Sequence, residues 1–135
     1  MKPAEDVIGA VGFSTMAVRP GDTTVSMGIS DLPVVATSHL LNLMESACCA
    51  ALAEFLDSGE TSYLLHSDIT LSGSATVGDE LRANARCVDI DGREVCFECE
   101  VFEGERLIAS AELKRATVER ISYLARAAAQ SLVNP

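Results

Sequence analysis

The chain has 135 residues, a length typical of one domain, and we expect a single domain over residues 1–135. Apolar residues make up 48 % of the chain and aromatic residues only 4 %, so small aliphatic side chains must fill the core. Such a core often gains burial by self-association, which favours a homo-oligomer. Twenty acidic against ten basic residues give a net charge of −10, which argues against nucleic acid and anionic membranes as partners, because both attract basic surfaces.

The termini and the cysteines indicate a cytoplasmic protein with free thiols. No run approaches the roughly 18 apolar residues of a membrane-spanning helix, and residues 1–6 (MKPAED) lack the pattern of a signal peptide. The five cysteines are odd in number, so we expect no disulfide framework. Cys96 and Cys99 form a C-x-x-C inside an alternating strand pattern, where positions three apart face opposite sides. We therefore expect no metal site and no cofactor.

The N-terminal third predicts two strands joined by a turn. Residues 13–18 read as a first strand, and Pro20-Gly21-Asp22 as a turn. Residues 23–29 alternate, with Val25, Met27 and Ile29 on one face, which predicts a second strand. The segment Asp31-Leu32-Pro33 ends that pattern.

Residues 38–56 change to a helical period. Their apolar positions cover more than one stripe of a helix: Leu40, Leu41, Leu43, Met44, Ala47, Cys48, Ala51, Leu52 and Phe55. A helix with so wide an apolar surface is mostly buried. Thr37 and Ser38 are both suitable N-caps, and Gly59 is a suitable stop.

The remainder predicts an antiparallel meander followed by a helix. Strand patterns occupy residues 63–71, 79–89, 94–102 and 106–118, and a helical pattern occupies 119–133. Asp91-Gly92 and Glu103-Gly104 lie where hairpin turns need glycine at positive φ. Because the helix at 38–56 is the only long apolar one available to cover the sheet, we predict an α+β hotdog fold. In that fold an antiparallel sheet wraps around one long central helix, here with an added C-terminal helix.

Residues 34–48, VVATSHLLNLMESAC, resemble the helix-start segment of the fluoroacetyl-CoA thioesterase family. That family carries Ala-Thr-Gly, an apolar stretch, Leu-Met-Glu, a small residue and Ala-Cys. The resemblance extends from about Gly21 to Tyr123 and includes Asp91-Gly92-Arg93. It implies hydrolysis of an acyl-CoA or acyl-carrier thioester to the free acid and thiol, without a cofactor.

The resemblance also implies site residues. The family's helix-start threonine matches Thr37, and its helix glutamate matches Glu45. Its strand histidine falls on Leu71, and its aromatic lid on Asp31-Leu32-Pro33. Other thioesterases of this superfamily act with one helix carboxylate and no histidine.

The residues themselves also single out Glu45. A carboxylate inside a very apolar helix costs free energy unless it is paired or lines a cavity, and burial would make it a usable base or nucleophile. Thr37 stands at a helix start, where free N–H groups and the positive end of the dipole suit a thioester carbonyl. The alternatives are an exposed Glu45 and a Thr37 that only caps the helix.

Further candidates lie around this pair. We expect His39, in the first helical turn, to be catalytic, and Ser38, Asn42, His66 and Arg115 to contact substrate. Asn42 is one turn from Glu45, and Arg115, beside Lys114, offers charge for the coenzyme A phosphates. On a regular strand His66 faces away from Leu71, since the two are five positions apart. The alternative for each of these polar residues is an ordinary place on the surface without a role in the site.

Two other functions compete with hydrolysis. The loss of the family's histidine at Leu71 favours a non-catalytic protein that binds and sequesters an acyl thioester. A hotdog dehydratase is disfavoured, because Asp31 stands where that class carries its histidine. Whether the protein hydrolyses or sequesters the thioester, we expect a homodimer or a dimer of dimers, with the ligand along the subunit interface.

Overall fold

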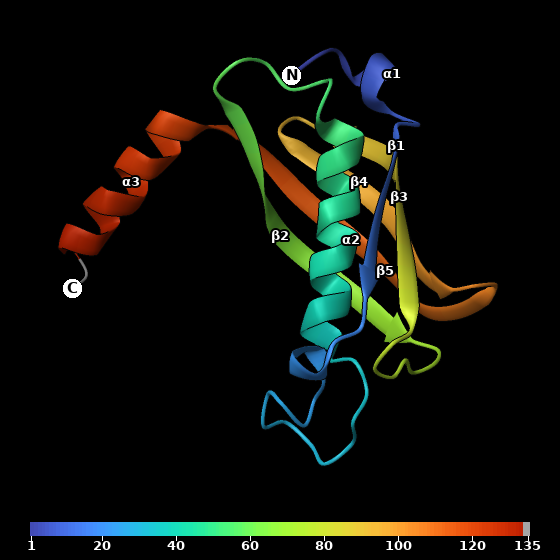
Figure 1. The fold of residues 1–135 in the computed structure, drawn as a ribbon. Coiled ribbons are helices and arrows are strands. Elements are labelled where there is room, and N and C mark those ends of the chain that lie inside the picture. The colour runs from blue at the N-terminus through green and yellow to red at the C-terminus, as the bar shows by residue number, and fades with distance from the viewer. Residues whose placement is uncertain (134–135) are drawn as a thin grey trace.

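The computed structural model describes residues 1–133, which form a five-stranded sheet curved around one long helix (Figure 1). In chain order the elements are α1 (Ala4–Val7), β1 (Val11–Ala17), the 3₁₀ helix η1 (Pro20–Asp22), α2 (Thr37–Leu52), β2 (Glu60–Leu71), β3 (Glu80–Asp91), β4 (Glu94–Glu103), β5 (Arg106–Glu119) and α3 (Arg120–Val133). The strand order is β1-β3-β4-β5-β2, and each neighbouring pair is antiparallel. This arrangement confirms the predicted α+β hotdog fold.

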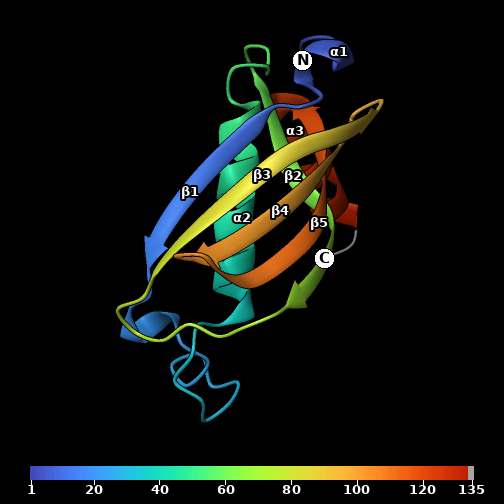
Figure 2. The ribbon, with the colours of Figure 1, turned by 90° about the vertical axis from the view of Figure 1, so that its right-hand side faces the viewer.

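The core lies between α2 and the concave face of the sheet. Figure 2 shows β1, β3, β4 and β5 crossing α2 along one side of the molecule. The helix buries residues spaced three and four apart: Leu40, Leu43, Met44, Ala47, Cys48, Ala51 and Leu52. They meet alternate residues of the strands, such as Ala83, Ala85, Phe97 and Leu113. Small side chains thus fill the core, with Phe97 the largest of the fully buried ones.

The predicted strand at residues 23–29 is wrong. That segment is a series of turns, in which the Met27 N–H donates to the Thr23 carbonyl at 3.1 Å and the Gly28 N–H donates to the Val25 carbonyl at 3.1 Å. Only Thr23 forms a bridge, with Val35. The alternating pattern did not produce a strand because hydrogen bonds within the segment satisfy its backbone in place of bonds to a neighbouring strand. The apolar side chains of the segment are left exposed.

The predicted N-caps are also wrong. Ala36 occupies the N-cap position of α2 without a side-chain hydrogen bond, and Thr37 is the first helical residue. The Ala36 N–H donates to the Asp22 carbonyl at 2.9 Å. This backbone contact with η1 holds the start of the helix, in place of the side-chain cap that the sequence predicts. The helix ends at Leu52, earlier than predicted, and Gly59 has a φ of +85° in the turn before β2.

The meander agrees with the prediction, with strand ends shifted by up to three residues. Gly92 and Gly104 have φ values of +61° and +59° in the two hairpin turns, as the turn signals indicated. Cys96 pairs with Lys114 on the outer face of the sheet, while Cys99 is buried against α2, with its Sγ 3.6 Å from that of Cys48. Within residues 1–133 the five cysteines are free.

The C-terminal helix α3 projects from the body beyond β2, which is an edge strand (Figure 1). Its one stacking contact joins the rings of Tyr63 and Tyr123, whose centroids lie 4.9 Å apart. None of the described helices is long and apolar enough to cross a membrane.

Candidate active site

Glu45 lies on the flank of α2 that faces β5 and β2. Its Oε1 accepts a hydrogen bond of 2.6 Å from Nη1 of Arg115 in β5. The Arg115 side chain is only 6 % exposed and that of Glu45 is 27 % exposed. The carboxylate therefore reaches solvent from beside the core, with a guanidinium that offsets its charge, and the alternative of a freely exposed Glu45 does not hold.

Arg115 is held on three sides. Besides the bond to Glu45, its Nε donates to Ser62 Oγ and its Nη2 to the Ser62 carbonyl, both at 3.0 Å. A fork of donors suits this geometry better than a single ammonium would. The contact of Arg115 with the coenzyme A phosphates stays a prediction, and within the chain its guanidinium binds Glu45 and Ser62. Nothing in the sequence singled out Ser62. Arg115 lies on the same face of β5 as the core residues Ala111 and Leu113, so the strand period indicates that it is buried.

Thr37 and Ser38 begin α2 and are exposed. The first amides of a helix lack partners within the helix and carry its positive partial charge. Thr37 and Glu45 are eight residues apart, about 12 Å along the helix axis. Within one chain the two groups are therefore too far apart to touch the same carbonyl carbon.

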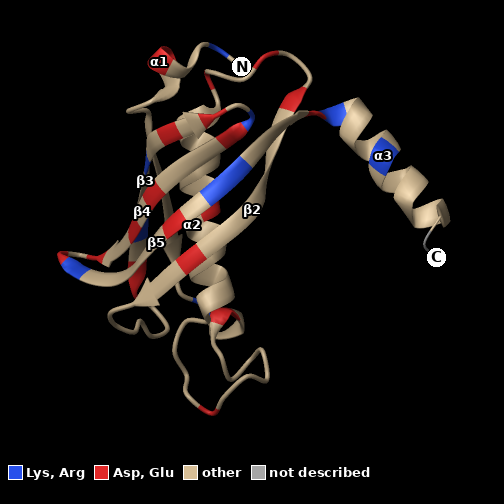
Figure 3. Cartoon of the chain, turned by 180° about the vertical axis from the view of Figure 1, so that it is seen from behind, with Lys and Arg blue, Asp and Glu red and all other residues tan. Residues whose placement is uncertain are grey.

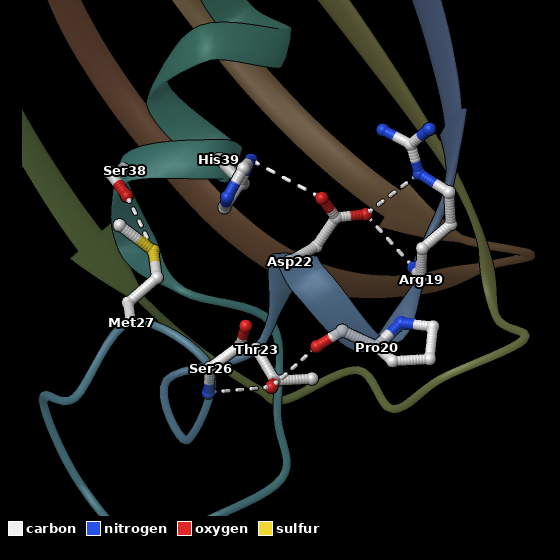
Figure 4. A network of polar contacts seen from close by, with 8 residues as sticks. All are labelled: Arg19, Pro20, Asp22, Thr23, Ser26, Met27, Ser38 and His39. Atoms are coloured by element: carbon white, nitrogen blue, oxygen red, sulfur yellow. Dashed lines mark hydrogen bonds and ion pairs between the residues drawn. The ribbon is translucent and has the colours of Figure 1, made fainter.

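His39 and Asn42 lie on the other flank of α2. His39 Nδ1 is 3.7 Å from Oδ1 of the buried Asp22 (Figure 4). Both line a hollow of about 260 Å³ against β1, together with Ser14, Thr15, Met16, Arg19, Asp22, Leu43 and Ser46. Six helical positions separate His39 from Glu45, which is about 120° around the axis. The structure therefore groups His39 with Asp22 and away from Glu45.

Asp22 anchors the loop that precedes α2. Its Oδ2 accepts from the Arg19 backbone N–H at 2.9 Å and lies 3.5 Å from Arg19 Nε. The backbone N–H of Arg19 holds the pKa of Asp22 below its ordinary value, so the carboxylate is ionised at neutral pH. Together with the bond from Ala36 to its carbonyl, Asp22 closes the base of the 23–35 loop.

That loop presents apolar side chains beside the helix start. Its exposed apolar residues are Val25, Met27, Ile29 and Leu32. Ser38 Oγ donates to Met27 Sδ at 3.5 Å, so the loop reaches the first turn of α2 (Figure 4). The surface beside Ser38 is thus aliphatic, with no aromatic ring from this segment.

His66 and Leu71 face opposite sides of the sheet. His66 pairs with Lys114, on the outer face, where it lines a hollow with Cys96. Leu71 pairs with Ala109, on the same face as Arg115. The face argument from the sequence thus agrees with the register, and His66 lies across the sheet from Glu45. Residues 1–133 contain no group of three or more His, Cys, Asp or Glu side chains that could hold a metal.

A five-stranded antiparallel sheet wrapped around one long helix matches solved thioesterase structures. A threonine-to-alanine mutant of the fluoroacetyl-CoA thioesterase FlK with fluoroacetate has a TM-score of 0.84 at 22 % identity, covering 91 % of this chain and 97 % of that one. A hypothetical protein of Thermus thermophilus from the thioesterase superfamily has a TM-score of 0.85 at 23 % identity, covering 100 % of both chains. The fold is therefore that of the hotdog thioesterases.

Residues 18–121 match the family model described as fluoroacetyl-CoA-specific thioesterase. The chain belongs to this family, and it is an acyl-CoA thioesterase, which hydrolyses a thioester to the acid and the thiol. The family assignment does not favour the alternative of a binding protein without activity. No curated protein is close enough in sequence to count as a match.

Proposed function

We propose that this thioesterase acts with Glu45 as its base or nucleophile, held by Arg115, and with the helix-start amides at Thr37 and Ser38 as the groups that polarise the thioester carbonyl. The observation that carries the proposal is the 2.6 Å contact between the half-buried Glu45 and the buried Arg115. A paired carboxylate that still reaches solvent is available to a water molecule or to a substrate carbonyl.

The groups of one site come from two copies of the chain. The separation of about 12 Å between Thr37 and Glu45 along one helix supports this assembly. The open edge of β2, which carries Ser62, a hydrogen-bond partner of Arg115, supports it as well. We therefore propose a homodimer or a dimer of dimers, with the helix start of one copy facing Glu45 of the other.

The chemistry then needs one proton carrier. Glu45 takes a proton from water while the water oxygen attacks the thioester carbon, and helix amides stabilise the oxyanion. Collapse of the tetrahedral intermediate breaks the carbon–sulfur bond, and the proton on Glu45 passes to the leaving thiolate. Direct attack by the carboxylate, followed by hydrolysis of the anhydride, gives the same products.

The proposed substrate is an acyl-CoA. One similar structure is a mutant of FlK in complex with acetyl-CoA, at 22 % identity and a TM-score of 0.84. Leu71 in place of the family's histidine and an aliphatic loop in place of its aromatic lid separate this chain from the fluoroacetate-specific members. We propose a cytoplasmic location, which free cysteines favour.

Glu45→Gln tests the assignment of the base. It keeps the shape and one acceptor but removes the basic oxygen, so hydrolysis of the best acyl-CoA should fall on the order of 10²–10⁴-fold. Thr37→Ala should cost less, since the helix amides remain. The measurement is thiol release from a panel of acyl-CoAs, and Glu54→Gln, an exposed glutamate just after α2, is the matched control.

Two outcomes would count against the assignment. Wild-type rates in Glu45→Gln would remove Glu45 from the mechanism. Tight binding of an acyl-CoA by the wild-type protein, with no thiol released from any member of the panel, would replace hydrolysis by sequestration.

A further inference from the structure

Three arginines at one corner of the molecule have no charged or aromatic partner within residues 1–133. Every other basic side chain in this part of the chain forms an ion pair or lies over an aromatic ring. The exceptions are Arg93, in the turn between β3 and β4, and both basic residues of α3, Arg120 and Arg126. Figure 3 shows these two basic positions on α3, which carries no acidic residue. In a chain with a net charge of −10, such a local excess of positive charge favours an anionic ligand.

Two of these arginines line the same hollow. Arg93 and Arg126 border a hollow of about 460 Å³, together with the hydroxyl groups of Thr117 and Ser122 and the carboxylates of Glu60 and Glu119. Both arginines are exposed, so their guanidinium groups are open to a ligand from solvent. A guanidinium offers a planar fork of donors that matches the oxygens of a phosphate group. The hollow therefore has the donors that a phosphorylated ligand needs.

The two carboxylates of the hollow are held by other donors. Glu119 accepts from two backbone N–H groups in the first turn of α3, at 2.6 and 3.3 Å. Glu60 accepts from the Asp57 N–H at 2.7 Å and pairs with the amino group of Met1. These donors offset the negative charge of the carboxylates, so the positive charge of the two guanidinium groups remains available to an anion.

The hollow begins close to the proposed site. Thr117 lies two residues after Arg115 on β5, which is about 7 Å along the strand. Thr117 also pairs in register with Ser62, whose Oγ accepts from Arg115. A ligand that reaches from Glu45 to the hollow needs a reactive group at one end, phosphates at the other and a linker between them. An acyl-CoA has this form, because its pantetheine arm separates the thioester from the phosphates.

We propose that Arg93 and Arg126 bind the phosphates at the nucleotide end of the acyl-CoA while the thioester lies at Glu45. The inference rests on the proposed function, which places the thioester there. Helix α3 then supplies one of the two guanidinium groups of the site. The stacking of Tyr123 on Tyr63, with centroids 4.9 Å apart, holds the first turns of α3 against β2 and so keeps Arg126 near the hollow.

Two substrates with the same acyl group test the assignment. One is the best acyl-CoA, and the other is the N-acetylcysteamine thioester of the same acid, which has no phosphate. In a variant with both Arg93→Gln and Arg126→Gln, the KM for the acyl-CoA should rise about tenfold or more while kcat changes little, because charge-assisted hydrogen bonds to the phosphates are lost. Hydrolysis of the N-acetylcysteamine thioester should stay as in wild type. Arg82→Gln, an exposed arginine at the start of β3, is the control that should change neither substrate.

Calorimetric titration with coenzyme A and with pantetheine measures the site without hydrolysis. Wild type should bind coenzyme A about tenfold or more tightly than pantetheine, and the double variant should lose this difference. The same result in a wild-type protein that hydrolyses no thioester would remove the proposed function and still support the phosphate site.

Three results would overturn the proposal. The first is an unchanged KM for the acyl-CoA in the double variant. The second is an equal loss of activity with both substrates, which would show that the two arginines support the fold and not the phosphates. The third is displacement of coenzyme A by an equal concentration of inorganic phosphate, which would show a general anion site.

Discussion

At the scale of single residues, Arg115 sets the electrostatics of the site. Three hydrogen bonds to Glu45 and Ser62 hold a guanidinium that is almost fully buried. Arg115→Met keeps much of the volume but leaves Glu45 and Ser62 without their donor. We expect the free energy of unfolding to fall by about 1–3 kcal/mol, measured by urea denaturation, together with a loss of thioester hydrolysis.

A double variant separates the two effects of that change. Arg115→Met combined with Glu45→Gln removes the unpaired charge, so it should regain part of the stability while staying inactive. Arg115→Lys keeps the charge without the fork and should fall between wild type and Arg115→Met. If Arg115→Met unfolds at the wild-type urea concentration and retains full activity, the ion pair contributes neither to stability nor to catalysis.

At the scale of elements, the packing of β1 against α2 depends on Gly12. A Cβ at this position would overlap backbone atoms of Ala47 and Ala51 in α2. Backbone atoms cannot rotate away as the end of a flexible side chain could. Gly12→Ala should therefore lower the free energy of unfolding by about 1–3 kcal/mol, the usual effect of overpacking. Thermal or urea unfolding measures it.

Gly21 provides the comparison for this prediction. An added Cβ at Gly21 meets nothing within 4 Å, and its φ is not in the positive range. Gly21→Ala should stay within about 0.5 kcal/mol of wild type, as surface substitutions usually do. Equal stability of Gly12→Ala and Gly21→Ala would contradict the close approach of β1 and α2.

At the scale of the whole molecule, thiol reactivity reports on the integrity of the core. Cys49 is exposed and Cys96 is half-buried, whereas the other three cysteines are buried. The contact with Cys99 and burial raise the pKa of Cys48, and burial raises that of Cys87. A disulfide reagent should modify Cys49 first and Cys96 next, and should reach the buried thiols only on global unfolding.

The controls for this prediction are simple. Cys49→Ser should remove the fastest phase, and denatured, unreduced protein should titrate with five thiols. Detection of only one thiol in the denatured protein would show disulfides and contradict the free state of the cysteines. Rapid modification of all five in the native protein would contradict the buried core between α2 and the sheet.

The sequence by itself determined the elements whose causes are local. Residues spaced three and four apart placed the long helix, alternation placed four strands, and Gly92 and Gly104 placed the hairpins, because backbone conformation and side-chain period depend on near neighbours. The same reading identified Glu45 as a carboxylate in an apolar helix. The family resemblance of residues 34–48 rested on this local pattern too.

Only the tertiary structure decided the contacts between distant segments. Arg115 lies 70 positions from Glu45 in the sequence, so its role as the partner of that carboxylate appears only when β5 packs beside α2. His39 likewise lies beside Asp22, 17 positions earlier in the sequence, although its place in the first helical turn predicted a role in the site. The segment 23–29 alternates like a strand but forms turns, because no neighbouring strand supplies the hydrogen bonds that alternation presumes. Spacing along the chain carries no information about which far surface a side chain will meet, and that is settled by how the helix and sheet pack.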